Sequence, residues 1–302
     1  MNTDYSCRLT ILTPTYNRGK ELKNLADSLC KQSAGSFQWL VIDDGSNDDT
    51  KSFIESLEAR QFEIEYHYKE NGGKHTALNY AHPFIRGKFI CIVDSDDTLV
   101  PDAVEIICKY LDQYEENEEI ACLSFQKAKS DGVPLVKNMP DTPVISDHIS
   151  FRLNGNRPGD CCEVVRTSVF KQYHFPVFPG ERFMSEGFLW TQIALKYKTV
   201  YLNQVIYLCE YLENGLTNSG RSMRIRNPLG GMLNSNSYLS ASKTKPIRLK
   251  LLEKETLLYI CYGKFAGMDY GALRHACARP GLMTINYPLG IMLFRKWKKH
   301  AE

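Results

Sequence analysis

The sequence lacks a surplus of either charge. Of its 302 residues, 37 are Lys or Arg and 35 are Asp or Glu, which gives a formal net charge of +2 at pH 7. Nucleic-acid-binding domains carry a clear basic excess, so nucleic acid is not the expected partner. Hydrophobic residues make up 43% of the chain, a globular proportion that can bury a sizeable core in one large α/β domain or two smaller domains.

Long apolar runs are missing as well. No uninterrupted run reaches the roughly 18 residues of a membrane-spanning helix. Residues 1–10 hold one Arg and no apolar region, so we expect no signal peptide. The ten cysteines form no C-x-x-C pair and no Cys/His cluster with zinc spacing. Most lie among apolar residues, which is typical of reduced, buried thiols. The sequence therefore predicts a cytoplasmic protein.

Two nucleotide-binding signatures are also absent. No G-x-G-x-x-G occurs, which disfavours a nicotinamide enzyme. Gly73 and Lys74 do not belong to a phosphate loop of the G-x-x-x-x-G-K-[ST] type, because position 68 is Tyr and position 75 is His.

Strand-like and helix-like segments alternate through the first 115 residues. Short apolar runs predict strands at 9–13, 37–42, 63–68 and 89–93. Apolar residues with helical spacing predict the helices 20–31, 50–60, 74–84 and 101–113. Such alternation is typical of a parallel sheet with helices on both faces, and ligands bind beyond the carboxyl ends of its strands.

Polar motifs stand at three of those strand ends, in residues 14–17, 43–46 and 94–97. The last motif holds Asp94, Asp96 and Asp97, whose negative charges would repel one another without a cation. Carboxylates at this spacing suit Mg²⁺ or Mn²⁺, which also bind phosphate oxygens. The alternative is an acidic turn that caps the helix from residue 101, which fits Asp97 best.

Two chemistries fit an apolar strand that ends in Asp-x-Asp. Residues 94–98 match the Asp-x-Asp-x-Thr signature of haloacid-dehalogenase-type phosphohydrolases, in which Asp94 would be the phosphoryl nucleophile. That signature normally ends the first strand and needs a later acidic pair, whereas here it ends the fourth strand and no Asp-Asp follows residue 97. The metal-binding motif of nucleotide-sugar glycosyltransferases is the better match.

Four motifs occur in order, at residues 9–18, 39–50, 71–79 and 90–97. Together they closely resemble the GT-A glycosyltransferases of family 2, strongly over residues 8–115 and more weakly to about 220. The resemblance implies a Rossmann-like, mostly parallel central sheet with a helical C-terminal extension. We expect a GT-A domain over 1–235, with a nucleotide-sugar half (1–115) and an acceptor half (116–235), followed by an extension over 236–302.

The resemblance also implies roles for matching residues of the donor site. Pro14 and Tyr16 would line the pocket for uracil and ribose, and Asp44 would accept a hydrogen bond from the base. Lys74 would lie near the diphosphate, and Asp94 would contact the ribose. Asp96 would bind a divalent cation, Mn²⁺ or Mg²⁺.

The second half of the chain offers a general base for the acceptor hydroxyl. Family members place an acidic motif before a helix there, and Glu186 is the matching residue. The commoner motif has Asp where this chain has Gly187, so Glu181 remains an alternative. Residues 214–220, which precede several arginines, are either a lid over the diphosphate or an ordinary loop.

The tail 281–302 combines an apolar stretch with a basic end. This pattern suits the surface of an anionic membrane, at the cytoplasmic face. A helix docked on the domain, with a solvated basic end, explains it equally well.

The resemblance implies a function in polysaccharide biosynthesis. It is inverting, metal-dependent transfer of a sugar from a nucleotide diphosphate sugar, by preference a UDP-sugar, to a hydroxyl of a glycan or lipid-linked oligosaccharide. A glycan- or nucleotide-binding relative without activity is the non-enzymatic alternative.

Overall fold

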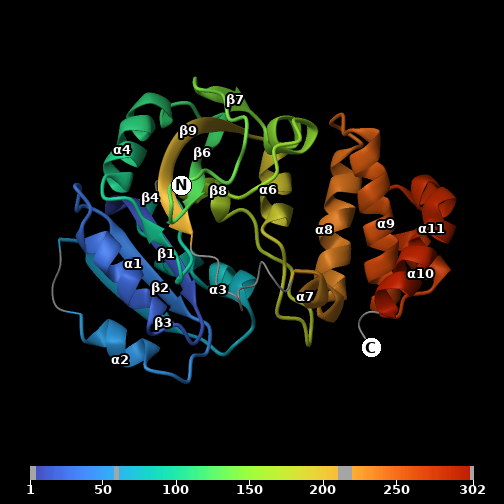
Figure 1. The fold of residues 1–302 in the computed structure, drawn as a ribbon, viewed down its shortest axis with the longest axis horizontal. Coiled ribbons are helices and arrows are strands. Elements are labelled where there is room, and N and C mark those ends of the chain that lie inside the picture. The colour runs from blue at the N-terminus through green and yellow to red at the C-terminus, as the bar shows by residue number, and fades with distance from the viewer. Residues whose placement is uncertain (1–4, 58–60, 210–219, 300–302) are drawn as a thin grey trace. The chain divides into compact units, whose positions relative to one another are not determined.

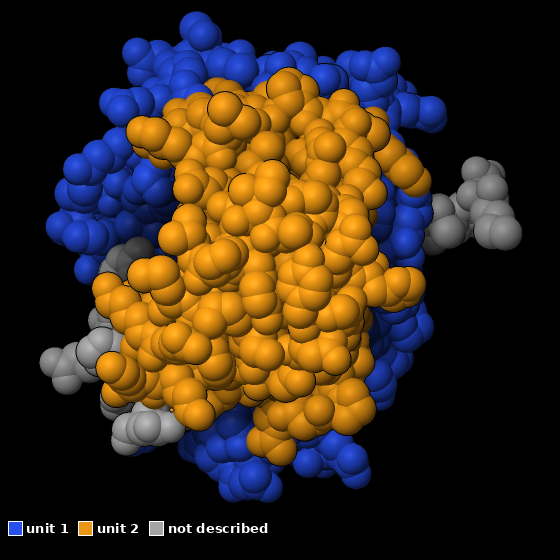
Figure 2. Space-filling view, turned by 90° about the vertical axis from the view of Figure 1, so that its right-hand side faces the viewer, with its two compact units in different colours: residues 1–146, 157–174, 197–211 blue, residues 147–156, 175–196, 212–302 orange. Residues whose placement is uncertain are grey.

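The computed structural model describes residues 5–57, 61–209 and 220–299. The chain divides into two compact units, which Figure 2 colours separately. The first comprises residues 1–146, 157–174 and 197–211, and the second comprises 147–156, 175–196 and 212–302. The boundary expected at residue 235 falls inside a helix of the second unit, and the domain division stays a prediction.

A nine-stranded sheet is the centre of the first unit as described. Its strands are β1 (Cys7–Thr15), β2 (Gln38–Asp43), β3 (Glu63–Tyr68), β4 (Gly87–Ile92), β5 (Thr98–Leu99), β6 (Ile120–Lys129), β7 (Val144–Ser146), β8 (Cys161–Arg166) and β9 (Lys198–Cys209). The order is β3-β2-β1-β4-β8-β6-β9-β5, and β7 pairs with β9. Strands β1 to β4 pair in parallel, so the parallel arrangement predicted for them is confirmed.

The sheet becomes mixed beyond β4. Strand β8 inserts between β4 and β6 and is antiparallel to both. Gly132, Pro134, Pro140 and Pro143 predict a loop-rich stretch from residue 115 to about 160, yet this stretch contains the ten-residue strand β6, which is almost entirely buried. The expectation was wrong there because Gly and Pro residues lie only in the segment that links β6 to β8.

Helices cover the sheet of the first unit. They are α1 (Glu21–Cys30), α2 (Thr50–Glu55), α3 (Lys74–Tyr80), the 3₁₀ turn η1 (His82–Phe84), α4 (Ala103–Tyr114) and α5 (Thr167–Phe170). In α1, Leu22, Leu25 and Leu29 share one face and enter the main core. Figure 1 shows α1 lying across β1 to β3. The predicted alternation of strands and helices is confirmed in this part of the chain.

The second unit is helical in its described residues. Its elements are the π-type turn η2 (Ile149–Asn154), α6 (Gly187–Ala194), α7 (Gly220–Arg226), α8 (Pro228–Ala241), α9 (Leu249–Phe265), α10 (Tyr270–Ala276) and α11 (Pro280–Lys298). Residues 214–234 are rich in Asn, Ser, Gly and Arg, a composition that predicts a flexible segment. Residues 214–219 lie outside the described residues, and from Gly220 onward the expectation was wrong. Small residues let α8 pack closely here, since a Cβ atom at Gly231 would lie 2.9 Å from the ring of Tyr262.

Helix α11 packs on α9. A Cβ atom at Gly290 would lie 2.6 Å from Cγ2 of Ile260, and the rings of Phe265 and Phe294 are 4.8 Å apart at their centroids. The docked-helix interpretation of the tail is therefore confirmed for one face of α11. None of the described helices is both long and apolar enough to cross a membrane.

Candidate active site

The carboxyl ends of β1, β2 and β4 meet at one edge of the sheet. Thr15 pairs with Asp43 at the ends of β1 and β2, and the Val93 amide, just after β4, donates to Leu12 of β1. The three polar motifs are thus brought to the same edge, as parallel pairing predicts. Tyr16 stands there with 44% of its surface exposed.

The Asp44 carboxylate holds the loop that precedes α3. It accepts hydrogen bonds from the amides of Gly72 (3.0 Å) and Gly73 (2.6 Å) and from the Lys69 ammonium. Gly73 has a φ of +94°, which an L side chain rarely adopts, so glycine is needed for its amide to reach Asp44. Asp44 is only 3% exposed. Its charge is therefore largely satisfied within the protein, and a bond to a nucleobase would need one of these donors to give way.

Neighbouring Asp43 has a purely local role. Its carboxylate accepts from the Ser46 amide at 2.7 Å and from the Tyr66 hydroxyl at 2.7 Å. An Asp at the start of a turn is expected to bond nearby amides, and these contacts, which fix the turn after β2, confirm that role for Asp43.

Lys74 and Asp94 form an ion pair at this edge. Lys74 is the first residue of α3, which places its side chain beside the end of β4. Burial would raise the pKa of Asp94, but the positive charges of Lys74, Lys127 and Arg18 hold that pKa below its ordinary value. Asp94 is therefore an anion held among cations, which suits it to accept hydrogen bonds.

Asp96 has a different electrostatic environment. Burial and the charge of Asp94 raise its pKa above the ordinary value, although the Arg18 guanidinium lies 3.6 Å from its carboxylate. A further positive charge would favour the ionised form of Asp96.

Tyr207, from β9, closes the acidic turn. Its hydroxyl accepts from the Asp94 amide at 3.0 Å and donates to Asp97 at 2.7 Å. Burial and the charge of Asp94 raise the pKa of Asp97 to about 6. The ammonium of Lys127 lies 4.0 Å from the centroid of the Tyr207 ring, because Lys127 and Tyr207 are register partners in β6 and β9. We call Lys74, Asp94, Asp96, Asp97 and Tyr207 the edge cluster.

The edge cluster could supply only part of the coordination shell of a divalent cation. No group of three or more His, Cys, Asp or Glu side chains that could hold a metal occurs in the described ranges 5–57, 61–209 and 220–299. Asp96 supplies hard oxygen ligands and lies in a site where a cation would offset repulsion from Asp94. A diphosphate would have to supply further oxygens.

Four contributors to this edge were not found from the sequence. Arg18 ends the motif 9–18, and Lys69 lies just before the motif 71–79. The sheet order places Lys69 beside Asp44 and Arg18 beside Asp96. Lys127 and Tyr207 carry no local signal, because their position depends on the register of two strands about eighty residues apart.

Glu181, in the second unit, caps a helix. Its carboxylate accepts from the amides of Leu229 (2.7 Å) and Gly230 (2.8 Å) at the start of α8. These amides have no partner inside the helix, so the carboxylate satisfies them and also meets the positive end of the helix dipole. The Glu181 carboxylate therefore has a structural use at the start of α8.

Glu186 immediately precedes α6 and is partly exposed. Its carbonyl oxygen accepts from the Trp190 amide at 3.1 Å, within the first turn. The next residue is Gly187, where a Cβ atom would lie 2.9 Å from the Tyr238 hydroxyl. The commoner motif has Asp at this position, where this chain has Gly187, and a side chain there would approach the Tyr238 hydroxyl closely.

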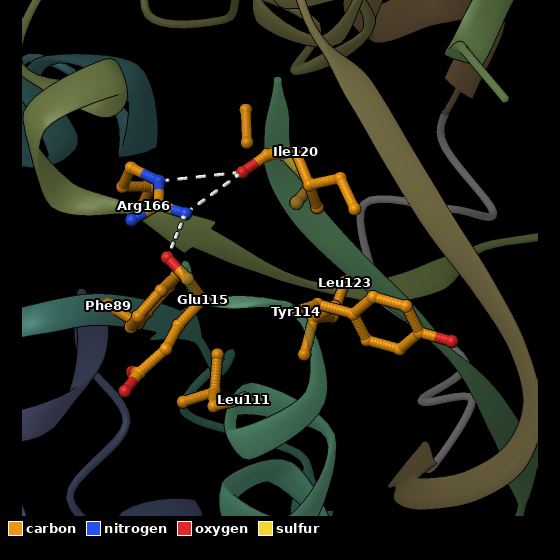
Figure 3. A pocket seen from close by; sticks show the side chains of 9 residues that line it. Phe89, Leu111, Tyr114, Glu115, Ile120, Leu123 and Arg166 are labelled. Carbon is orange, nitrogen blue, oxygen red and sulfur yellow. Dashed lines mark hydrogen bonds between the residues drawn. The ribbon is translucent and has the colours of Figure 1, made fainter. Parts of the chain in front are cut away.

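A small pocket near the start of β4 is structural. Figure 3 shows Phe89, Leu111 and Arg166 among its lining residues. The Arg166 guanidinium donates to the carbonyl oxygens of Glu115 (2.9 Å) and Ile120 (3.2 Å) and lies 5.0 Å from the Phe89 ring. The N–H groups of Arg166 hold the turn that follows α4. We therefore assign this pocket a structural role and do not treat it as a candidate active site.

Comparisons with known proteins bear on this arrangement. The model of the family described as glycosyl transferase family 2 matches residues 10–173. An uncharacterized glycosyltransferase of Rickettsia felis is 32% identical over 128 residues, which are 42% of this chain and 21% of the relative. A chondroitin synthase of Pasteurella multocida is 32% identical over 115 residues, 38% of this chain and 12% of the relative. The chain thus spans about a fifth or less of the length of these relatives.

Two solved structures share the fold. The first is S. aureus TarS 1-349 in complex with UDP-GlcNAc, with a TM-score of 0.64 and 18% identity over 96% of this chain and 92% of that one. The second is the mannosyltransferase PcManGT from Pyrobaculum calidifontis in complex with GDP-Man and Mn²⁺, with a TM-score of 0.57 and 17% identity over 98% of this chain and 84% of that one.

Proposed function

The chain belongs to glycosyltransferase family 2, and from this premise we propose that it transfers a sugar from a nucleotide diphosphate sugar to a hydroxyl group of a glycan or lipid-linked oligosaccharide. Its fold is the GT-A fold that the sequence predicts. The observation that carries the proposal is the meeting of Tyr16, Asp44 and the edge cluster at one end of parallel strands. The family match sets the phosphohydrolase alternative aside.

We propose that the donor binds along this edge. Tyr16, with its exposed ring, and Pro14 would line the pocket for the base and ribose, and Asp94 would bind the ribose. Asp44 would contact the base as the resemblance implies, and it would also shape the donor site by holding Gly72 and Gly73. UDP-sugars are the preferred donors. TarS, in complex with UDP-GlcNAc, and PcManGT, in complex with GDP-Man, share only the fold with this chain, so the preference for UDP rests on the sequence resemblance.

The diphosphate would meet positive charge on this edge. Lys74 and Arg18 carry ammonium and guanidinium groups beside Asp94 and Asp96. Asp96, with oxygens of the diphosphate, would hold Mn²⁺ or Mg²⁺, and a bound cation offsets the negative charge that develops on the leaving diphosphate.

We propose Glu186 as the general base. Its carboxylate would take the proton of the acceptor hydroxyl while the hydroxyl oxygen attacks the anomeric carbon and the bond to the diphosphate breaks, which inverts the anomeric configuration. Glu181, whose carboxylate binds two amides at the start of α8, is the alternative base. Polysaccharide biosynthesis at the cytoplasmic face of a membrane is the proposed setting, and the chondroitin synthase match supports a glycan acceptor.

A thermal-shift panel of nucleotide diphosphate sugars, with and without Mn²⁺, tests donor binding. A bound donor raises apparent stability, and the nucleotide that does so identifies its base. We expect a UDP-sugar to give the largest shift, and more so with Mn²⁺. No shift with any nucleotide sugar would contradict the proposal.

Glu186→Gln tests the base. The substitution keeps the shape of the side chain but cannot accept a proton, so we expect kcat to fall about 10²- to 10⁴-fold while donor affinity is nearly unchanged. Glu181→Gln is the matched control and should lose less activity. A larger loss in the control would assign the base to Glu181. Donor binding by the unaltered protein without turnover on any glycan would favour the inactive relative.

A further inference from the structure

Helix α11 carries a stripe of exposed apolar side chains on the face that does not pack on α9. Ile285 is 78% exposed, Leu289 49% and Met292 64%. Their spacing of four and three residues places them on one side of the helix. Met283 and Gly290, on the other side, are buried. Docking on α9 therefore explains one face of α11 and leaves the stripe unexplained.

Basic residues continue the same stripe. Lys296 lies seven residues after Leu289, and Lys299 lies seven residues after Met292. Both lysines are exposed and lie on the same side of the helix as the stripe. No Asp or Glu occurs between residues 270 and 301. The same stretch contains six Arg or Lys residues: Arg274, Arg279, Arg295, Lys296, Lys298 and Lys299.

A groove between α9 and α11 adds to this surface. It is lined by Leu257 and Leu258 of α9 and by Leu293 and Trp297 of α11. Its charged lining residues are Lys250, Glu253 and Lys254. Leu293 lies one turn from Leu289 on α11, so the groove adjoins the stripe. The Trp297 ring is held in place by the Arg221 guanidinium, 5.0 Å from its centroid.

We propose that the stripe Ile285, Leu289 and Met292, with Lys296 and Lys299, is a docking surface for an anionic lipid bilayer. A surface-lying helix needs an apolar face beside Lys and Arg, and this face of α11 has both. The net positive charge is complementary to anionic headgroups and would oppose docking of a second, equally basic copy of the same helix. The inference does not depend on the donor, the acceptor or the transfer reaction.

Vesicle flotation of the full chain tests the proposal. The probes are vesicles of phosphatidylcholine alone and of phosphatidylcholine with phosphatidylglycerol. We expect binding to the anionic vesicles, little binding to the neutral ones, and weaker binding as salt rises, because each Lys or Arg near the surface contributes about fivefold in affinity. Absence of binding to anionic vesicles, or equal binding to both kinds, would overturn the proposal.

Substitutions locate the surface without unfolding the protein. Truncation of α11 would expose the core around Met283, so exposed side chains are changed instead. Ile285→Ser with Met292→Ser should weaken binding at least tenfold, and Lys296→Gln with Lys299→Gln should remove much of the salt dependence. Val133→Ser with Val177→Ser, two exposed apolar positions elsewhere, is the matched control and should bind as the unaltered protein does.

Two further results would count against a lipid occupant. If Ile285→Ser with Met292→Ser binds vesicles normally, another surface carries the binding and the assignment is wrong. If sedimentation shows a dimer that this variant abolishes, and vesicles do not compete for it, the stripe is an interface between copies of the chain.

Discussion

Asp94 and Asp96 are two residues apart, yet their surroundings push their pKa values in opposite directions. Cations around Asp94 lower its pKa, while burial and the charge of Asp94 raise that of Asp96. The local sequence identified both carboxylates as functional. It could not show that their pKa values shift in opposite directions, because Lys127 and Tyr207 reach this site only through strand pairing.

Asp96→Asn should abolish the dependence of UDP binding on Mn²⁺. The amide cannot supply an anionic oxygen to the cation, whereas the base and ribose contacts remain. Calorimetry of UDP binding with and without Mn²⁺ measures the effect, and Asp102→Asn, at an exposed carboxylate nearby, is the control. An Asn variant with the same Mn²⁺ enhancement as the unaltered protein would rule out Asp96 as the ligand.

Tyr16→Ala should weaken UDP binding without lowering the melting temperature. With 44% of its surface exposed, the side chain contributes less packing than a core residue, while stacking of a base on an aromatic ring contributes about 1–3 kcal/mol. Tyr16→Phe keeps the ring and should retain most of the affinity. Equal losses in both variants would assign the contact to the hydroxyl rather than to stacking.

At the scale of elements, α8 depends on a side chain forty-eight residues earlier for its N-terminal cap. The sequence of α8 is rich in Gly, Asn and Ser, which on their own favour loops, and Pro228 at its start is the main local signal for a helix. Helix α1 was predicted because its apolar spacing is regular, whereas α8 was missed because tertiary packing and the Glu181 cap decide its conformation.

Glu181→Ala should destabilise the protein by about 1–2 kcal/mol. Two amides at the start of α8 would lose their acceptor and the favourable charge at the helix N-terminus. Urea unfolding followed by circular dichroism measures the loss. Glu253→Ala, at an exposed position of α9, should change stability by much less.

Gly187→Ala should also destabilise, by about 1–3 kcal/mol, because the new methyl group would meet the Tyr238 hydroxyl. Tyr238→Phe in the same background removes that hydroxyl and should recover part of the loss. A double-mutant cycle gives the coupling between the two positions. Additive effects would show that Tyr238 does not restrict position 187.

At the scale of the whole molecule, the family motifs predicted the parallel half of the sheet and the convergence of residues at its edge. They did not predict β8 between β4 and β6, because a short antiparallel strand inserted late in the chain leaves no repeating pattern. In the second unit, regular apolar spacing predicts a helix over residues 246–265, which corresponds to α9.

The contribution of His82 to stability should be lost as the pH drops from about 6.5 to about 4, while the raised pKa of Asp97 acts in the opposite direction. Burial, followed by the charges of His174 and Lys171, lowers the pKa of His82 to about 4. The unfolded chain binds a proton to this ring at higher pH than the folded chain does, so acid favours unfolding in this window, by no more than about 3 kcal/mol.

Melting temperatures at pH 7 and pH 4.5 measure this effect. His82→Phe keeps an aromatic ring beside Phe170, whose centroid lies 5.0 Å away, and should reduce the loss on acidification. His275→Gln, at an exposed histidine, is the control. An unchanged loss in His82→Phe would assign the acid sensitivity to other groups.

The contacts of Tyr207 affect the order in which the protein can mature during synthesis. All the donor-site residues that the family motifs identify lie within the first 96 residues, but the hydroxyl that binds the Asp94 amide and the Asp97 carboxylate belongs to residue 207. A ribosome-bound chain can therefore pair β1 to β4 early and still lack a closed acidic turn. Because contacts so distant in sequence form late, we expect nascent chains to acquire nucleotide affinity only after β9 has left the ribosome.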